Sequence, residues 1–326
     1  MSVQKIARMA GVSVATVSRV LNNSDRVKPA NREKVLAAIE ESRYQPNLLA
    51  RQLRTARSSM ILVLVSDISN PFCAEVVKGI EAQAEQQGYR ILLCNSGADI
   101  ARSRSSLQLL SGKMVDGIIT MDAFSKLPEL SQLIGAAPWV QCAEHDDEGR
   151  VSCVGIDDQR AAQAVVRHLA AQGRQRIALI NHDLSYKYAR LRQQGYLRQL
   201  EEEQREWQTI ICASALSFSA GKAAMLALLA GETRPDAVFA VSDTLAAGAM
   251  AAIQQAGLRI PQDIAVVGFD GSDLAEMVSP PLTTLAQPSG VMGRRACELL
   301  LQKIAQPDVP PQRVVMPAEL VVRASG

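Results

Sequence analysis

The stretch Val3–Asn22, VQKIARMAGVSVATVSRVLN, decides how this chain is organised. Its apolar residues recur at helical spacing as far as Ala10, and Gly11 then interrupts the pattern. Ser13 is a suitable N-cap for a second helix, in which apolar residues again recur at helical spacing. Two short helices joined by a three-residue turn form a helix-turn-helix. The sequence therefore predicts a small helical unit at the N-terminus.

The charge of this region supports a role in binding nucleic acid. Residues 1–57 contain eleven Lys or Arg and four Asp or Glu, a net charge of +7, whereas the rest of the chain has 24 basic and 29 acidic residues, a net charge of −5. A cationic segment on a mildly anionic body is typical of DNA-binding proteins. Charge alone fits a solvated basic tail equally well. A third helix, expected from Pro29 to about Ser42, favours a folded head.

The second helix of a helix-turn-helix lies in the major groove of DNA, with its first turn facing the base edges. Val14 and Ala15 can offer apolar contacts, for instance to thymine methyl groups, and Arg19 can form a bidentate pair with a guanine. Thr16 and Ser18 are expected at phosphates or against the neighbouring helix. By itself, this pattern is only moderately specific for DNA binding.

The same stretch resembles the amino-terminal signature of the LacI/GalR family of bacterial transcription regulators, most closely in VSVATVSRV at residues 12–20. The pair Val14-Ala15 is similar to the galactose-repressor type of recognition helix. The resemblance continues through residues 44–53 and reaches residues 280–288, so it covers nearly the whole chain. Lys28-Pro29 departs from the family's usual Ser or Thr cap, and we expect it to shift a helix boundary without changing the function.

Residues 45–57 form a linker in which Asn47 can cap a helix of about two turns. Such a helix is too short to be stable alone in water, so it needs its symmetry mate or DNA as a partner. In the family, a leucine from each hinge helix enters the minor groove as a wedge, and Leu53 matches that position. We also expect Asn22 and Arg54 at the DNA. The alternative is a linker whose leucines pack on the body.

From Ser58 onward, short aliphatic strands alternate with amphipathic helices, which indicates parallel sheets with helices on both faces. Strands are expected at 61–65, 90–94, 117–121, 139–142, 176–181, 209–212, 237–241 and 264–268. Helices are expected near 72–87, 102–112, 158–172, 190–203, 218–230, 244–256 and 290–304. The alternation provides enough strands for two lobes.

The family's regulatory domain resembles periplasmic sugar-binding proteins, so the resemblance implies two lobes facing across a cleft. The expected fold is α/β, with a small all-α helix-turn-helix head and a two-lobed periplasmic-binding-protein-like body of doubly wound parallel sheets. The expected domains are a DNA-binding head at 1–45, a hinge helix and linker at 46–58, and an effector-binding and dimerisation domain at 59–326 whose two lobes interleave.

Parallel sheets bind ligands at the carboxyl ends of their strands, where several polar residues stand in this sequence. Arg192 matches the family arginine that hydrogen-bonds effectors, and its planar fork suits vicinal hydroxyls or a carboxylate. Asp270 matches the family aspartate that accepts hydrogen bonds from hydroxyls. A strand-end Asp is more commonly a structural cap, and Asp243 can equally cap the next helix. The predicted ligand-binding residues are Phe72, Asp157, Tyr188, Arg192, Leu216, Asp243 and Asp270.

Other features limit the possible functions. The 326 residues are 48% hydrophobic and 21% charged, as in a globular protein of two or three domains. No apolar run approaches a membrane span, the N-terminus has no export segment, and the six scattered cysteines contain no CxxC pair. We expect a cytoplasmic protein with reduced, mostly buried thiols and no membrane partner. The sequence lacks GxxxxGK[ST], HExxH and GxSxG, and its three histidines share no metal-ligand spacing, so we expect no cofactor, no metal and no enzymatic activity.

Two functions remain at this stage. The first is a regulator, most simply a repressor, that binds a palindromic operator as a homodimer and responds to a small cytoplasmic ligand through order and disorder of the hinge helix. The resemblance makes a sugar or sugar derivative the leading effector and a nucleoside the alternative, acting as inducer or corepressor. The second is a cytoplasmic sugar-binding protein or carbohydrate enzyme with an incidental basic head. Residues 319–326 carry no leucine heptad, so we expect a dimer and not a tetramer.

Overall fold

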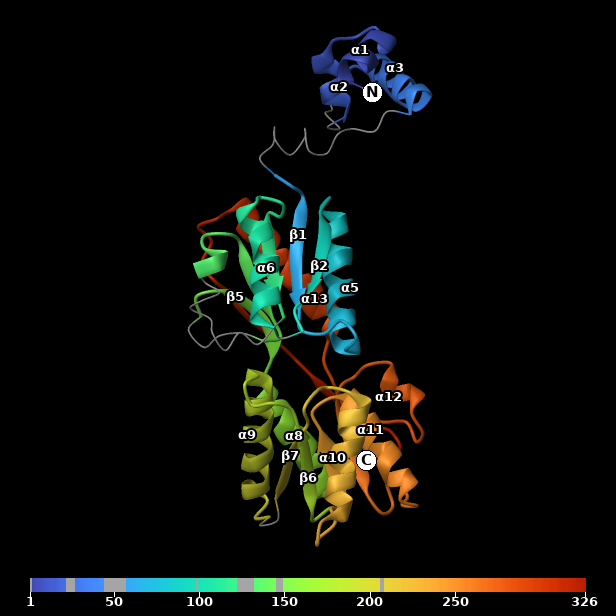
Figure 1. Cartoon of the computed structure of the whole chain (residues 1–326), viewed down its shortest axis with the longest axis vertical. Helices are drawn as coiled ribbons and strands as arrows, with labels where there is room; N and C mark the ends of the chain where they lie inside the picture. The colour runs from blue at the N-terminus through green and yellow to red at the C-terminus, as the bar shows by residue number, and fades with distance from the viewer. Residues whose placement is uncertain are drawn as a thin grey trace. The chain divides into compact units, whose positions relative to one another are not determined.

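In the computed structural model the chain forms two compact units, residues 1–58 and 59–326 (Figure 1). The structure describes residues 2–21, 27–43, 57–97, 99–121, 132–144, 149–205 and 208–326. The expected hinge helix, together with Asn22, Leu53 and Arg54, lies outside the described residues and stays a prediction. The proposed domain boundaries at 45 and 58 also remain predictions.

The head consists of the three expected helices, α1 (Val3–Ala10), α2 (Val14–Leu21) and α3 (Pro29–Ser42). Gly11 ends α1 with φ of 63°, a left-handed conformation that costs glycine little. Ser13 caps α2, because its Oγ accepts a hydrogen bond from the Thr16 backbone N–H at 3.1 Å. The helices bury a small core of Ile6, Ala7, Ala10, Val17, Val20, Val35 and Ala38.

Two six-stranded sheets form the body. The first sheet has the order β11-β5-β4-β3-β1-β2, with β1 Met60–Val65, β2 Arg90–Asn95, β3 Gly117–Thr120, β4 Trp139–Cys142, β5 Ser152–Ile156 and β11 Arg313–Met316. The second has the order β12-β10-β9-β8-β6-β7, with β6 Ile177–Asn181, β7 Thr209–Cys212, β8 Ala237–Ala240, β9 Ala265–Asp270, β10 Thr283–Ala286 and β12 Glu319–Val321. Paired strands run parallel in both sheets, with the antiparallel pair β10 and β12 at one edge as the exception.

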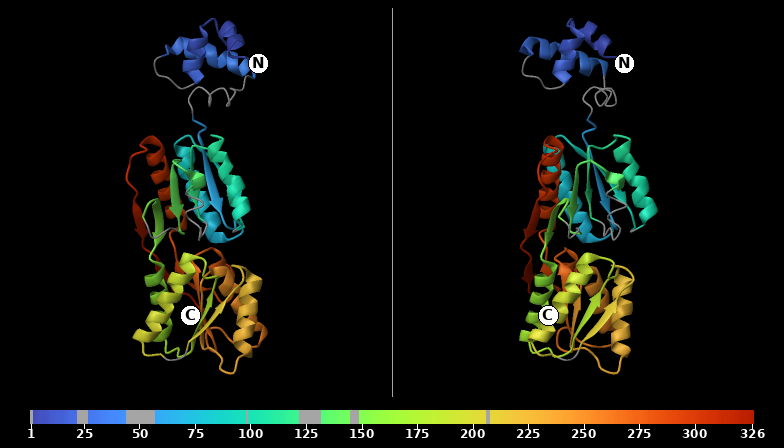
Figure 2. Two further views of the ribbon diagram at one scale, coloured as in Figure 1. Left: turned by 60° about the vertical axis from the view of Figure 1, so that its left-hand side comes forward. Right: turned by 90° about the vertical axis from the view of Figure 1, so that its left-hand side faces the viewer.

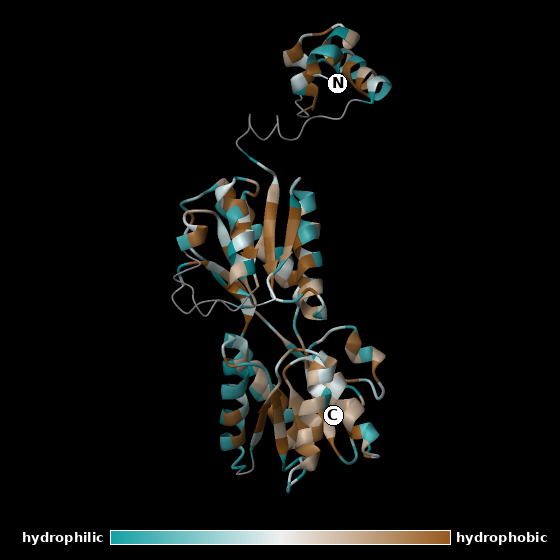
Figure 3. Ribbon diagram, in the orientation of Figure 1, coloured by the Kyte–Doolittle hydropathy of each residue, from teal (hydrophilic) through white to brown (hydrophobic). Residues whose placement is uncertain are grey.

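Helices cover both faces of each sheet (Figure 2). They are α5 Pro71–Gln86, α6 Ile100–Ser111, α8 Asp158–Ala171, α9 Lys187–Glu202, α10 Phe218–Ala230, α11 Asp243–Gln255, α12 Leu274–Met277 and α13 Ser289–Ala305. Strand β1 shows why the sheet is covered twice. Ile61, Val63 and Val65 belong to the core shared with α5 and α13, whereas Leu62 and Leu64 pack with residues of α6. Figure 3 shows the resulting hydrophobic strands and the largely hydrophilic α9.

The two sheets define two lobes between which the chain passes three times. The first lobe comprises residues 59–156 and 289–316, and the second comprises 158–286 and 319–326. Crossings follow β5 and β10, and a third joins β11 to β12. The interleaved two-lobed α/β fold is therefore confirmed. The expected strand set omitted 152–156, 283–286, 313–316 and 319–321. The last three are short and complete the sheets only through these crossings.

The cysteines are all free thiols, and Cys73, Cys142, Cys153 and Cys297 are buried, as expected. Burial raises the pKa of the Cys142 thiol to about 12, so this thiol is protonated and unreactive at neutral pH. Among the residues that the structure describes, no helix is long and apolar enough to cross a membrane.

Candidate ligand-binding site

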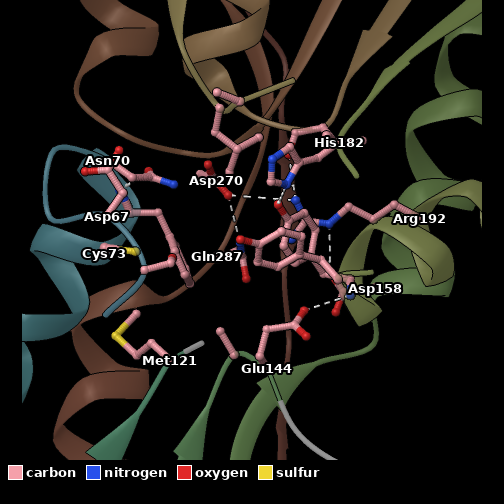
Figure 4. A pocket seen from close by; sticks show the side chains of 18 of the residues that line it. Asp67, Asn70, Cys73, Met121, Glu144, Asp158, His182, Arg192, Asp270 and Gln287 are labelled. Atoms are coloured by element: carbon pink, nitrogen blue, oxygen red, sulfur yellow. Dashed lines mark hydrogen bonds and ion pairs between the residues drawn. The ribbon is translucent and has the colours of Figure 1, made fainter. Parts of the chain in front are cut away.

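A cavity of about 430 Å³ lies at the carboxyl ends of the strands of both sheets. Both lobes contribute to its wall, which is the position that the parallel topology predicts for a ligand. Figure 4 shows Asp67, Asn70 and Cys73 at one part of this wall and Arg192, His182 and Asp158 at another. The residues that line the cavity include Asp67, Phe72, Asn95, Glu144, Asp158, His182, Tyr186, Tyr188, Arg192, Leu216, Asp270 and Gln287.

Arg192 organises one end of the cavity, although its side chain is almost wholly buried. Its Nε donates to Asp158 Oδ1 at 2.8 Å, and its Nη1 donates to the Val241 carbonyl at 2.7 Å. The guanidinium carbon also contacts two aromatic rings, at 3.5 Å from the centre of Phe269 and 4.8 Å from that of Tyr188. These contacts fix the plane of the guanidinium and leave little freedom for it to reorient toward a ligand.

Asp270 ends strand β9 and faces Arg192 across 4.0 Å between Oδ1 and Nη1. Its backbone φ of 111° lies in a region that residues other than glycine rarely adopt. Its carboxylate accepts a hydrogen bond from Gln287 Nε2 at 2.9 Å. Burial raises the pKa of Asp270 well above its ordinary value, against the opposing charge of Arg192. Gln287 stands on the crossing that follows β10, so Asp270 is tied to a segment that joins the lobes.

His182 and two tyrosines form an aromatic wall. His182 Nδ1 lies 2.6 Å from the Tyr188 hydroxyl, and the ring centres of His182 and Tyr186 are 4.6 Å apart. Burial lowers the pKa of His182 below its ordinary value of 6.5, so the imidazole is neutral at pH 7. These rings offer an apolar surface with polar edges, which suits one face of a sugar or a planar base.

Glu144 and Asp158 line the cavity although they were absent from the residues predicted to bind ligand. Glu144 follows β4 by two residues, and Asp158 follows β5 by two residues. The strand-end rule applied to these strands would have identified both acids. Burial raises the pKa of Glu144, and hydrogen bonds from the Tyr188 and Lys187 backbone N–H groups oppose that rise.

The structure brings five of the predicted ligand-binding residues into the cavity wall, namely Phe72, Tyr188, Arg192, Leu216 and Asp270. Asp157 requires a correction, because its carboxylate caps α8 by accepting from the Arg160 N–H at 3.0 Å. The next residue, Asp158, lines the cavity in its place.

Asp243 also requires a correction, because it is not among the residues that line the cavity. Its Oδ2 accepts from the Ser272 N–H at 2.7 Å and its Oδ1 accepts from the Thr284 hydroxyl at 2.5 Å. The expected helix cap is instead Ser242, whose Oγ accepts from the Leu245 N–H at 3.2 Å. Asp243, the first residue of α11, therefore joins the loop after β9 to strand β10 of the second lobe.

In the head, α2 exposes part of its surface to solvent. Val14 has 47% of its surface exposed, and Ala15 and Arg19 are also exposed. Thr16 and Ser18 are half-buried, and the Thr16 hydroxyl is 2.9 Å from Ser13 Oγ. The opposite face of α2 packs into the core of the head through Val17 and Val20. This arrangement leaves the predicted base-reading side chains accessible.

A two-lobed α/β body with a polar cavity, joined to a helix-turn-helix head, defines a DNA-binding regulator with a ligand-binding domain. Comparisons with known proteins agree. Residues 2–47 match the model for bacterial regulatory proteins of the lacI family, and residues 166–326 match the periplasmic binding protein-like domain. The ribose operon repressor of Haemophilus influenzae is 35% identical, with 99% of this chain and 98% of that protein covered. The chain belongs to the LacI family of bacterial transcriptional regulators.

Solved structures support the same assignment. The Lac repressor dimer bound to operator and an anti-inducer is 29% identical and superposes with a TM-score of 0.89, covering 100% of this chain and 98% of that one. A LacI family regulator from Enterococcus faecium with bound ribose is also 29% identical, with a TM-score of 0.75 over 82% of this chain and 98% of that one. The resemblance of Val3–Asn22 to the LacI/GalR family is thus confirmed.

Proposed function

We propose that this chain is a repressor that binds a palindromic operator as a homodimer and changes its operator affinity when a small sugar enters the cavity. One observation carries the proposal: a single chain holds a basic helix-turn-helix head and a body with a polar cavity between its two lobes. One solved relative, the Lac repressor dimer, is bound to operator DNA, and another, the regulator from Enterococcus faecium, contains bound ribose. Neither unit alone would link a ligand to DNA.

The DNA contacts belong to the exposed face of α2. Arg19 reads a guanine through a bidentate pair, while Val14 and Ala15 contact thymine methyl groups. Thr16 and Ser18 contact phosphates, which orient the head without reading sequence. Asn22, Leu53 and Arg54 add contacts from residues 22 and 46–58, with Leu53 as the minor-groove wedge.

The effector is a neutral monosaccharide, and ribose is the first candidate. One relative is named as a ribose operon repressor, and the structure of another contains bound ribose. The cavity of about 430 Å³ is large enough for a small ligand. Phe72 and Tyr188 supply apolar surface, while Asn95, Arg192 and Asp270 supply polar groups. A purine base is the second candidate, because the rings of His182, Tyr186 and Tyr188 form a surface on which a planar ligand could stack.

We also propose that the chain is a cytoplasmic protein without enzymatic activity. The naming of its relatives as transcriptional repressors supports both statements.

The test is selection of bound sites from random duplex DNA by the purified full-length chain at a stated salt concentration, since phosphate contacts make affinity salt-dependent. We expect enrichment of one palindrome, followed by a change in its affinity on adding ribose. A decrease identifies ribose as an inducer and an increase as a corepressor. The selection is repeated with ribose and with purines if the free protein enriches nothing. Absence of a palindrome under all three conditions would exclude the regulator function.

A further inference from the structure

Glu144 links the two lobes beside the cavity. It belongs to the first lobe, and only 6% of its surface is exposed. Its Oε1 accepts a hydrogen bond from the Tyr188 N–H at 2.8 Å, and its Oε2 accepts one from the Lys187 N–H at 3.1 Å. Both N–H groups open α9 in the second lobe, whose own N-cap residue, Tyr186, makes no side-chain cap hydrogen bond. A carboxylate from one lobe therefore caps a helix of the other.

The start of a helix is a positive site, because its first N–H groups have no partner within the helix and its dipole favours negative charge. At the start of α9 that site adjoins the cavity, since Tyr186 and Tyr188 both line it. A ligand with a phosphate or carboxylate could be held there. Glu144 occupies this position with an anion that the protein itself supplies.

The Nε and Nη1 groups of Arg192 already have partners within the protein. Asp158 and the Val241 carbonyl take its hydrogen bonds, and Asp270 lies 4.0 Å from it. The described residues that line the cavity include four carboxylic acids, Asp67, Glu144, Asp158 and Asp270, against this one guanidinium. An anionic ligand would lie beside these acids, with Arg192 as the one positively charged side chain among the described residues of this wall. Like charges brought together across a binding surface disfavour the wrong partner strongly.

We propose that Glu144 is a specificity-determining residue that makes the cavity selective for uncharged ligands over phosphorylated or carboxylated ones. This inference rests on the proposed function, in that it concerns the effector of the same cavity. Glu144 acts in two ways: its charge repels an anionic ligand, and its position fills the helix end that such a ligand would use. The same contacts join the two lobes beside the cavity.

Two substitutions separate the charge from the contact. Glu144→Gln removes the charge and keeps a side-chain oxygen that can accept one of the two N–H groups. Glu144→Ala removes the charge and vacates the helix end. Asp183→Ala is the matched control, because Asp183 is an exposed acid shortly before α9, lies outside the cavity wall, and accepts its hydrogen bonds from Ser185.

Calorimetric titration of the full-length variants with ribose and with ribose 5-phosphate tests the proposal. We expect the unaltered chain to prefer ribose by at least about 100-fold, and Glu144→Ala to reduce that preference by at least about tenfold, with Glu144→Gln in between. Asp183→Ala should leave the preference within about twofold. The proposal is overturned if the unaltered chain binds both ligands equally, or if neither Glu144 variant changes the preference.

A second measurement does not depend on the identity of the effector. Inorganic phosphate should raise the melting temperature of the body in Glu144→Ala more than in the unaltered chain or in Asp183→Ala, because the vacated helix end then takes a free anion. Phosphate bound by the basic head contributes equally to all three proteins. Failure to bind ribose, with this phosphate effect present, would refute only the proposed effector. Absence of the phosphate effect in a folded Glu144→Ala variant would refute the role of Glu144.

Discussion

Replacement of Arg192 by alanine should destabilise the body of this protein strongly. The guanidinium and its partner Asp158 are each about 5% exposed, and the side chain also satisfies the Val241 carbonyl. Removing one member of a buried ion pair leaves the other as an uncompensated buried charge, which costs about 3–5 kcal/mol. This is a large share of a total stability of about 5–15 kcal/mol.

The expected loss can be measured as a melting temperature. For a unit of this size, 1 kcal/mol corresponds to about 2 °C, so Arg192→Ala should lower the melting temperature of the body by about 6–10 °C. Circular dichroism of the body's unfolding transition gives this value. Arg192→Lys should recover only part of the loss, because an ammonium group cannot hold the Asp158 carboxylate and the Val241 carbonyl in the fixed geometry of the guanidinium fork.

A double-mutant cycle identifies the cause. If the cost arises from the unpaired carboxylate, Arg192→Ala combined with Asp158→Ala should be less destabilised than the sum of the single variants, by at least about 1 kcal/mol. A drop of less than 2 °C for Arg192→Ala would refute the reasoning, since water would then be compensating the remaining carboxylates. Additive effects in the cycle would assign the loss to packing against the aromatic rings instead.

Further predictions concern the head and the body separately. Ser13→Ala should cost about 1 kcal/mol of head stability through loss of the helix cap, measured by thermal unfolding of the head. Arg19→Ala should weaken operator binding by about 1–3 kcal/mol and relax one operator position, and equal loss on random DNA would show that this residue contacts only phosphate. Gly195→Ala should cost about 1–3 kcal/mol in chemical denaturation, since its new Cβ would overlap the Gln159 carbonyl on α8. Because burial raises the pKa of Asp270 in the folded state, the native protein binds this proton more tightly than the unfolded chain, so this group's contribution to stability falls as pH rises above about 4. Asp270→Asn should flatten that fall in melting temperature, and an unchanged pH profile would count against the burial of this charge.

The head was predictable because its signals are local. Gly11 and Ser13 mark the end of one helix and the start of the next, and the observed bounds of α1, α2 and α3 agree with those expected from the sequence. Pro29 opened α3 where expected, even though Lys28 makes no side-chain cap hydrogen bond. The family resemblance identified the function of this unit, but the helical spacing alone already defined its fold.

The body was predictable where a strand is long and buried on both faces, as in β1 and β9. Strand 152–156 was missed although it is buried throughout. The other strands that were missed, at 283–286, 313–316 and 319–321, contain three or four residues each, and 313–316 alternates exposed with half-buried positions. Such segments become strands only because partners distant in sequence accept them at the edge or in the middle of a sheet. Periodicity in a short window contains no information about those partners.

The cavity wall includes five of the seven residues predicted to bind ligand, and one of the other two is adjacent in sequence to a lining residue. Asp157 and Asp158 are adjacent acids after the same strand, and the sequence does not show which one caps α8 and which one faces the cavity. The choice depends on how the chain turns from β5 into the second lobe. Asp243 presents the same difficulty at β8, where both a cap and a ligand contact fitted the pattern, and the actual role is to bind Ser272 and Thr284.

A strand-end rule can place Glu144 at the cavity, but it cannot show that the Glu144 carboxylate caps a helix of the other lobe. Its role follows from the approach of two lobes that are folded from separate stretches of chain, and it caps a helix 43 residues further along. Because its carboxylate contacts the second lobe directly, any ligand that changes the distance between the lobes must act on this contact. A ligand can shift such an equilibrium only by binding one arrangement more tightly than the other. The Glu144 carboxylate, which selects the ligand by charge, is therefore also a group through which ligand binding can change the position of one lobe relative to the other.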